Sequence, residues 1–128
     1  MQINRSDVKV MKFNFETPEK QYEITSPEIQ TNIVELAPVS NEDSEVFEKG
    51  KICRLELTFN IQLQDFKVEG LVTQSIQFVD YFDEIQKVSE EAIQELSRDL
   101  LDYVQRLTYD VTEISFDRPG YDLKFEPS

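Results

Sequence analysis

The sequence predicts an α+β fold, a four-stranded antiparallel sheet with one long helix packed on one face. Residues 51–78 show the alternation of apolar and polar residues that is typical of a long β-hairpin. Residues 89–107 carry the only strong helical pattern in the chain. Two shorter alternating segments, at 8–15 and 24–39, precede the hairpin and supply the other two strands. At 128 residues the chain is expected to form one domain, over 1–128.

The hairpin pattern is the clearest of the three. Pairing Leu63 with Phe66 around the turn Gln64-Asp65 places both apolar sets on the same face. That register sets Gly70 opposite Phe59, whose ring can cover the bare glycine backbone. The apolar positions are Leu55, Leu57, Phe59, Ile61 and Leu63 before the turn, and Phe66, Val68, Val72, Ile76 and Phe78 after it.

The shorter segments are less regular. The parity of the apolar residues in 8–15 changes near Met11, so either a bulge shifts the phase or both faces are partly covered. Thr17-Pro18 ends this strand, because proline has no N–H to give to a ladder. Prolines near both ends bracket the segment 24–39, and the acidic stretch 40–45 that follows is expected to be a mobile loop.

The helix is expected to begin after Ser89, whose hydroxyl can cap the first turn, and to end near Leu107. Its apolar stripe consists of Ile93, Leu96, Leu100, Val104 and Leu107. Beyond it, Ile114 and Phe116 are interpreted as a brief alternating tail, and Asp117-Arg118-Pro119-Gly120 as a turn. The final apolar residues, Tyr121, Leu123 and Phe125, are expected to dock on the same domain or on a neighbouring subunit.

Charge and composition exclude several classes of function. Lys and Arg number 13 against 26 Asp and Glu, and this net charge of -13 opposes binding to nucleic acid or to anionic membranes through a basic patch. The excess serves solubility, or attracts a basic partner. No run approaches the roughly 20 apolar residues of a membrane span, and residues 1–5 carry no signal-peptide pattern. The single cysteine, Cys53, cannot form an internal disulfide and is expected to be buried, so we expect a cytoplasmic protein.

The residue types also restrict catalysis. The chain has no histidine, which removes histidine-based nucleophilic arrangements and metal sites, and its three glycines are isolated. Asp80, Asp83 and Glu84 are the best remaining carboxylate cluster, although a solvated acidic loop explains them more simply. The acidic residues of 42–45 do not have the spacing of a calcium loop. We therefore expect no enzyme, no cofactor and no metal.

The connection at 79–85 is unusually aromatic for a loop. Apolar residues outside the regular stripes either complete the core and a subunit interface or line a groove for an extended chain. These residues are Tyr81, Phe82, Ile85, Val88, Tyr109, Tyr121 and Phe125.

The order of these elements resembles that of SecB, the bacterial export chaperone. The segment Lys12-Phe13-Asn14-Phe15-Glu16-Thr17-Pro18 resembles SecB's first strand, Asp-Ile-Ser-Phe-Glu-x-Pro. Glu69-Gly70-Leu71-Val72 resembles the turn into SecB's last strand. Residues 111–123, with Pro119, resemble the proline-containing segment that follows SecB's main helix. The chain is similar to an uncharacterised Gram-positive family with this fold.

The resemblance implies homo-oligomers built as dimers or dimers of dimers. It also implies that unfolded polypeptide binds in apolar grooves near the aromatic connection, with Tyr81, Phe82 and Ile85 as groove residues. SecB continues into a second helix at the point where this sequence ends, Ser128, and that helix helps to form its groove and its export contacts.

Two functions follow as hypotheses. The leading one is chaperone-like binding of unfolded or extended polypeptide, with affinity from main-chain pairing and apolar pockets. The alternative is an adaptor whose acidic face binds one specific basic protein, without chaperone activity.

Overall fold

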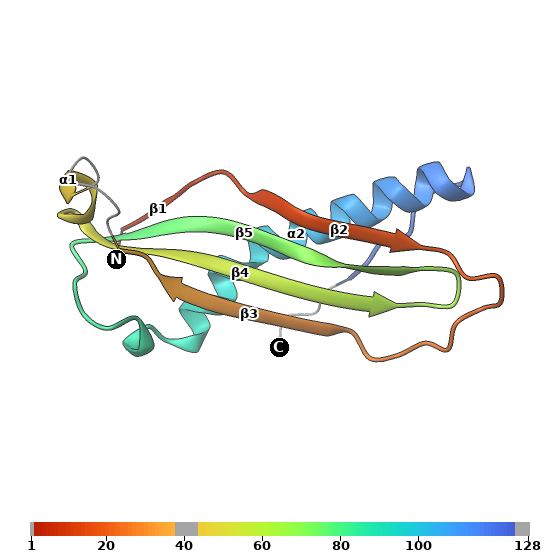
Figure 1. The fold of residues 1–128 in the computed structure, drawn as a ribbon, viewed down its shortest axis with the longest axis horizontal. Helices are drawn as coiled ribbons and strands as arrows, with labels where there is room; N and C mark the ends of the chain where they lie inside the picture. Colours follow the sequence, from red (N-terminus) through yellow and green to blue (C-terminus); the bar gives the residue numbers. More distant parts are fainter. Residues whose placement is uncertain (1, 38–43, 125–128) are drawn as a thin grey trace.

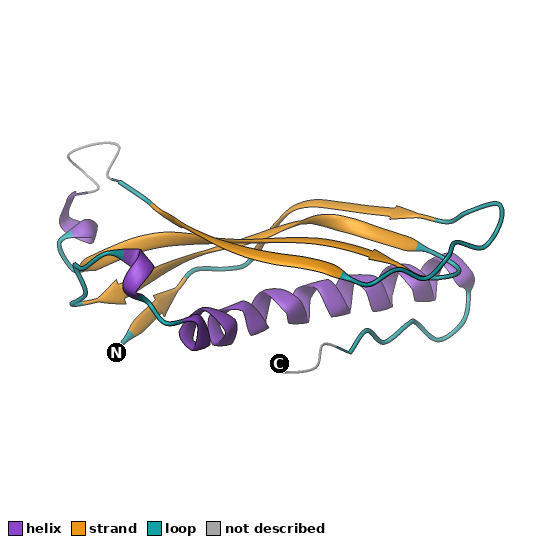
Figure 2. Cartoon of the chain, turned by 90° about the horizontal axis from the view of Figure 1, so that it is seen from below, coloured by secondary structure: helices purple, strands orange, loops and turns teal. Residues whose placement is uncertain are grey.

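An antiparallel sheet and one long helix form two layers in the computed structural model, which describes residues 2–37 and 44–124 (Figures 1 and 2). The strands are β1 (Ile3–Arg5), β2 (Lys9–Glu16), β3 (Glu28–Glu35), β4 (Gly50–Gln62) and β5 (Lys67–Val79). The helices are α1 (Ser44–Phe47), the short 3₁₀ helix η1 (Ile85–Lys87) and α2 (Glu90–Phe116). The predicted α+β class, an antiparallel sheet with one long helix packed on one face, is confirmed.

The five strands fill four positions in the sheet, because β1 and β2 both pair with the same edge of β5. The order across the sheet continues from β5 to β4 and β3. Residues 6–8 interrupt the ladder between β1 and β2, and there the hydroxyl of Ser6 accepts a 3.0 Å hydrogen bond from the N–H of Ser75. Of the two alternatives for the change of parity near Met11, the structure shows the bulge, since Val10 lies opposite Val72 and Lys12 lies opposite Leu71.

The predicted register of the β4–β5 hairpin is also confirmed. Phe59 pairs with Gly70, and the N–H of Leu63 donates to the carbonyl of Phe66 at 2.9 Å. A Cβ added to Gly70 would lie 2.1 Å from the carbonyl oxygen of Lys12. The sheet therefore needs glycine here, because β2 approaches the backbone of β5 too closely for a side chain.

The core lies between the α2 side of the sheet and the helix. The fully buried side chains come from alternate positions of β4 and β5 and from one stripe of α2, and include Leu55, Leu57, Ile61, Val68, Val72, Ile76, Phe78, Leu96, Leu100 and Val104. Cys53 is fully buried, as predicted, and its burial raises the pKa of the thiol to about 11.

The helix is longer than the sequence pattern predicts. Ser89 caps its first turn as expected, accepting from the N–H of Ala92, but α2 continues past Leu107 to Phe116. Thr108 and Thr112 extend the buried stripe, and their hydroxyls donate to the carbonyls one turn earlier at 2.8 Å. The prediction that Ile114 and Phe116 belong to an extended tail is therefore wrong.

Two other segments differ in extent from their predictions. β3 covers residues 28–35, which is less than the predicted strand at 24–39. Residues 40–43 of the predicted mobile loop lie outside the described residues, and Ser44 and Glu45 belong to α1. Among residues 2–37 and 44–124, no helix combines the length and the apolar character that a bilayer crossing requires.

Candidate functional site

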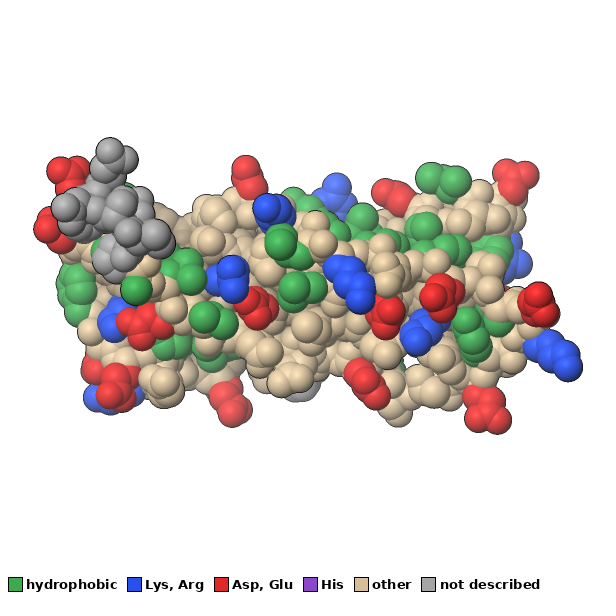
Figure 3. Space-filling model, viewed as in Figure 1, with side chains coloured by type: hydrophobic (Ala, Val, Ile, Leu, Met, Phe, Trp, Pro, Cys, Tyr) green, Lys and Arg blue, Asp and Glu red, His purple; other side chains and the backbone are tan. Residues whose placement is uncertain are grey.

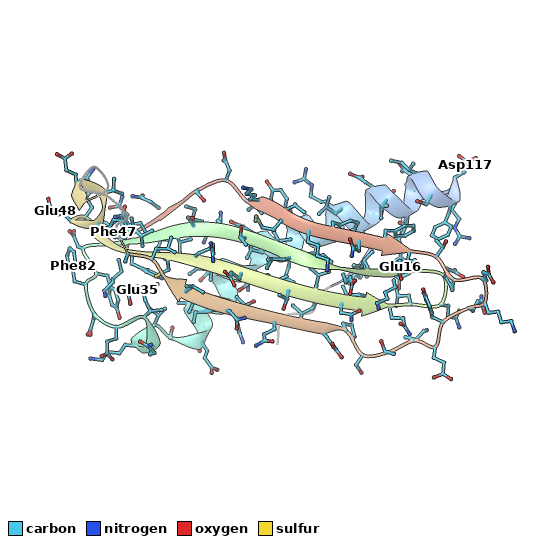
Figure 4. The ribbon with its side chains drawn as sticks, in the orientation of Figure 1. Glu16, Glu35, Phe47, Glu48, Phe82 and Asp117 are labelled. Carbon is cyan, nitrogen blue, oxygen red and sulfur yellow. The ribbon has the colours of Figure 1, made fainter. Side chains whose placement is uncertain are left out.

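The structure places the three predicted groove residues in different environments. Ile85, in η1, is only 5% exposed and belongs to the core. The ring of Tyr81 lies 5.8 Å from that of Phe78, and its hydroxyl donates to the carbonyl of Glu84 at 2.8 Å. Phe82 is 59% exposed at one end of the molecule (Figure 4). Phe82 is therefore the member of this set that a partner can contact without any rearrangement.

The acidic residues of the same connection bond to nearby groups. Asp83 accepts from the N–H of Glu84 at 2.8 Å and pairs with Lys87 at 3.3 Å. Asp80 has a left-handed backbone, with φ of 59°, and its N–H donates to the carbonyl of Lys49. In the described part of the chain, no three carboxylate or cysteine side chains gather closely enough to hold a metal ion.

A cleft of about 380 Å³ lies at the opposite end of the molecule, where the β4–β5 turn meets the end of α2. Four separate segments contribute its walls: the stretch before β3, the hairpin turn, the last turns of α2, and the turn that follows the helix. Its lining residues are Ile24, Leu63, Gln64, Asp65, Phe66, Thr112, Phe116, Arg118, Pro119, Gly120 and Tyr121.

One wall of this hairpin-end cleft is aromatic. The ring of Phe66 lies 5.5 Å from that of Tyr121 in an edge-to-face arrangement and 6.4 Å from that of Phe116. Phe66 is buried, whereas the side chain of Tyr121 is 47% exposed at the mouth. Arg118 closes the rim, with its guanidinium 5.1 Å from the centre of the Phe116 ring and 3.5 Å from the carboxylate of Asp65.

The chain after α2 runs back along the helix, on the side of the sheet that the helix covers (Figures 1 and 2). A left-handed residue, Asp117, ends the helix, and a Cβ on Gly120 would lie 2.3 Å from the carbonyl oxygen of Tyr109. The N–H of Tyr121 donates to the hydroxyl of Thr112 at 2.8 Å. Leu123 is 8% exposed and joins the core, so Tyr121 and Leu123 dock on their own domain, whereas Phe125 lies outside the described residues.

β3 forms one edge of the sheet, and within the described residues it pairs with β4 alone. The N–H of Leu36 donates to the carbonyl of Ile52, so alternate residues from Leu36 backwards face β4. The backbone groups of the intervening residues, Ile29, Thr31, Ile33 and Glu35, therefore point away from the sheet. An added strand could pair with these groups.

The charges are distributed unevenly over the surface. On the sheet face that α2 leaves uncovered, basic and acidic side chains alternate around small apolar patches (Figure 3). The exposed surface of α2 is mainly acidic, with Arg98 and Arg106 among Glu90, Glu91, Glu95, Asp99, Asp102, Asp110 and Glu113. The surface of α2 therefore carries part of the chain's excess of acidic over basic residues.

The sequence pattern did not reveal the hairpin-end cleft. Its residues come from segments that are distant in the sequence, and their meeting depends on where α2 ends. The turn signal at Asp117-Arg118-Pro119-Gly120, followed by Tyr121, was the one local indication that the chain reverses here.

The comparisons with known proteins agree with this architecture. The fold is similar to that of a protein of unknown function from Streptococcus agalactiae, with a TM-score of 0.78, 23% identity and 98% of each chain covered. It is also similar to a Mycobacterium tuberculosis SecB-like chaperone in complex with a ChAD peptide from the HigA1 antitoxin. That likeness has a TM-score of 0.57 and 13% identity, and it covers 98% of this chain and 88% of the other.

These likenesses place the chain among proteins with a SecB-like fold. Residues 1–125 match the family described as "Protein of unknown function (DUF1149)", and the chain belongs to that family. No curated protein matches the sequence.

Proposed function

We propose that this protein binds polypeptide segments in an extended conformation, as a chaperone-like protein. The observation that carries the proposal is the regular, outward-facing edge of β3, whose eight residues keep an unbroken register with β4. Main-chain hydrogen bonds along such an edge supply affinity that is independent of the client's sequence.

Two apolar regions support the same function. The hairpin-end cleft begins at Ile24, a few residues before β3, and Ile29 is 36% exposed on the α2 side of the strand. Phe82 offers apolar surface at the other end of the molecule. The M. tuberculosis neighbour was solved with a peptide bound, which supports a polypeptide as the class of partner.

The test is a single substitution that blocks the edge and leaves the sheet paired. The N–H of Thr31 points away from β4, so Thr31→Pro removes a donor that no strand uses and places a ring where a client strand would lie. The matched control is Thr31→Val, which keeps the N–H but loses the same hydroxyl contact with Ser97.

We expect wild type and Thr31→Val to bind a reduced, unfolded test protein with similar affinity in titration calorimetry. Thr31→Pro should bind at least about tenfold more weakly, which corresponds to about 1.4 kcal/mol. Thermal unfolding is the control that checks whether both variants are folded. If a folded Thr31→Pro variant binds as wild type does, β3 is not the client edge.

The acidic surface of α2 favours a second candidate, an adaptor that binds one specific basic protein. Salt distinguishes the two functions, because contacts between exposed charges weaken steeply once the Debye length falls to roughly 8 Å at physiological ionic strength. Binding through β3 and apolar pockets should change little over the same range. Charge reversal at Asp102 and Asp110 should abolish adaptor binding and leave client binding intact.

A further inference from the structure

The tail at residues 121–124 has the arrangement of a bound peptide. In an extended chain, side chains two residues apart point the same way. Tyr121 is 47% exposed, but its ring packs edge-to-face on Phe66; Leu123 is buried, whereas Asp122 and Lys124 are exposed. This alternation of side chains that contact the domain with side chains that face solvent is how extended peptides are recognised in grooves.

The contacts that hold the tail are few. They include one backbone donor, the N–H of Tyr121 to the Thr112 hydroxyl at 2.8 Å, and a hydrogen bond from the Gln105 amide to the Asp122 carboxylate. The tail lies outside the strands of the sheet. Among the described tail residues 121–124, burial of Leu123 is therefore the main anchor, and release of these residues would leave the sheet and α2 intact.

The tail also borders the open cleft. Tyr121 forms part of the wall of the hairpin-end cleft, and Ile24, which is 62% exposed, lines the same cleft. Removing the tail would therefore join this cleft to the site that Leu123 occupies. The combined groove would present an aromatic surface at Phe66, an amide donor at Gln105 and the buried site of Leu123, in the order in which the tail contacts them.

We propose that this groove is a binding site for extended segments with an aromatic residue two positions before a leucine, and that the tail is its internal competitor. The proposal deepens the proposed function and rests on it, since it names the class of client segment. Gln105 adds a preference for an acceptor side chain, such as that of aspartate, between the two anchors. A tethered competitor acts at an effective concentration of about millimolar, so external segments bind weakly until the tail is released.

The test uses the full chain and a fluorescent peptide with the sequence of residues 119–124, Pro-Gly-Tyr-Asp-Leu-Lys. Leu123→Ala removes the tail's anchor. We expect fluorescence anisotropy to show binding to Leu123→Ala at least about tenfold tighter than to wild type. The same peptide with alanine in place of its leucine should bind neither protein. Lys124→Ala, which changes an exposed residue of the same segment, should behave as wild type.

Gly120→Ala is a second, independent way to displace the tail from the groove. Its new Cβ would meet the carbonyl and ring of Tyr109, which displaces the tail without changing Tyr121 or Leu123. It should also raise peptide binding above that of wild type. The proposal is overturned if neither folded variant binds the peptide better than wild type, or if the leucine-free peptide binds equally well.

This test needs no client protein, so it separates the two proposals. Peptide binding to Leu123→Ala without any client binding to wild type or to the released variants would reject the chaperone-like function and keep the groove. Client binding to wild type without peptide binding to Leu123→Ala or to Gly120→Ala would reject the groove and keep the chaperone-like function.

Discussion

The two edges of the sheet are built differently. The edge made by β1 and β2 is interrupted around Ser6 and bulged at Met11. The β3 edge is straight, with continuous pairing from Glu28 to Glu35. Bulges and interruptions blunt an edge against strand addition, so β3 is the edge that remains available to a partner.

The two edges also differ in how they are anchored. The ring of Phe13 lies 6.0 Å from that of Phe59, and the ring of Phe15 lies 6.0 Å from that of Phe66. On the β3 side, the hydroxyl of Ser97 in α2 donates to the hydroxyl of Thr31 at 3.2 Å. Aromatic packing thus anchors the β2 edge, whereas the proposed client binding would use the outward backbone groups of β3.

Among substitutions that test this difference between the edges, we expect the largest loss in the free energy of unfolding at Gly70. Gly70→Ala places a Cβ against the Lys12 carbonyl, so β2 must move and the free energy of unfolding should fall by about 3 kcal/mol. The measurement is urea denaturation. Glu69→Ala, next to it on the opposite face, should cost less than about 0.5 kcal/mol. Equal losses would show that the close approach of β2 is unimportant.

Alkaline pH should lower the free energy of unfolding through Cys53, a residue of β4 that lies opposite Glu35 of β3. Burial, and secondarily Glu35 opposite on β3, raise the pKa of Cys53 from 9.0 to about 11. A raised pKa means that the stabilising contribution is present below the unfolded-state pKa and lost as pH rises towards the folded-state value. Hydrogen bonding to Glu35 likewise raises the pKa of Lys51.

Between about pH 8 and about pH 10, Cys53 should account for a loss of about 1.4 kcal/mol in the free energy of unfolding. The measurement is urea denaturation at both pH values for wild type and Cys53→Ala. The variant starts from a lower stability, but its alkaline loss should be smaller by this amount. Parallel losses in the two proteins would contradict the assignment to Cys53.

The smallest effect concerns the interruption between β1 and β2. Ser6→Ala removes the acceptor of the Ser75 N–H and should lower the free energy of unfolding by about 1 kcal/mol. Amide hydrogen exchange at Ser75 should accelerate in the variant. Ser26→Ala, at an exposed serine, is the control, and unchanged exchange at Ser75 would show that water replaces the hydroxyl at no cost.

Local patterns were enough to predict the hairpin, its register and the start of α2, and they narrowed the irregularity near Met11 to a bulge or two partly covered faces. In each case a few neighbouring residues decide the outcome, as Leu63 and Phe66 do at the turn. The end of α2 could not be predicted in this way, because Thr108 and Thr112 count as polar in a periodicity although their hydroxyls bond to the preceding turn.

The candidate site was harder to predict. Composition shows that residues 79–85 are rich in aromatic and aliphatic side chains, but it does not show which of them face the core. In the structure Ile85 is part of the core. The cleft at Phe66 and Tyr121 depends on the contact of distant segments. Which strand lies at an edge is likewise a property of the topology, so the open side of β3 follows only from the fold.

The bulge at Met11 has a consequence for self-association. A chain with two regular edges can stack without limit into a fibre, because each added copy offers a new edge. A sheet with one regular edge and one blunted edge presents a single open side. If two copies pair through β3, the antiparallel contact is isologous and closes on itself, and growth stops at a two-fold symmetric pair.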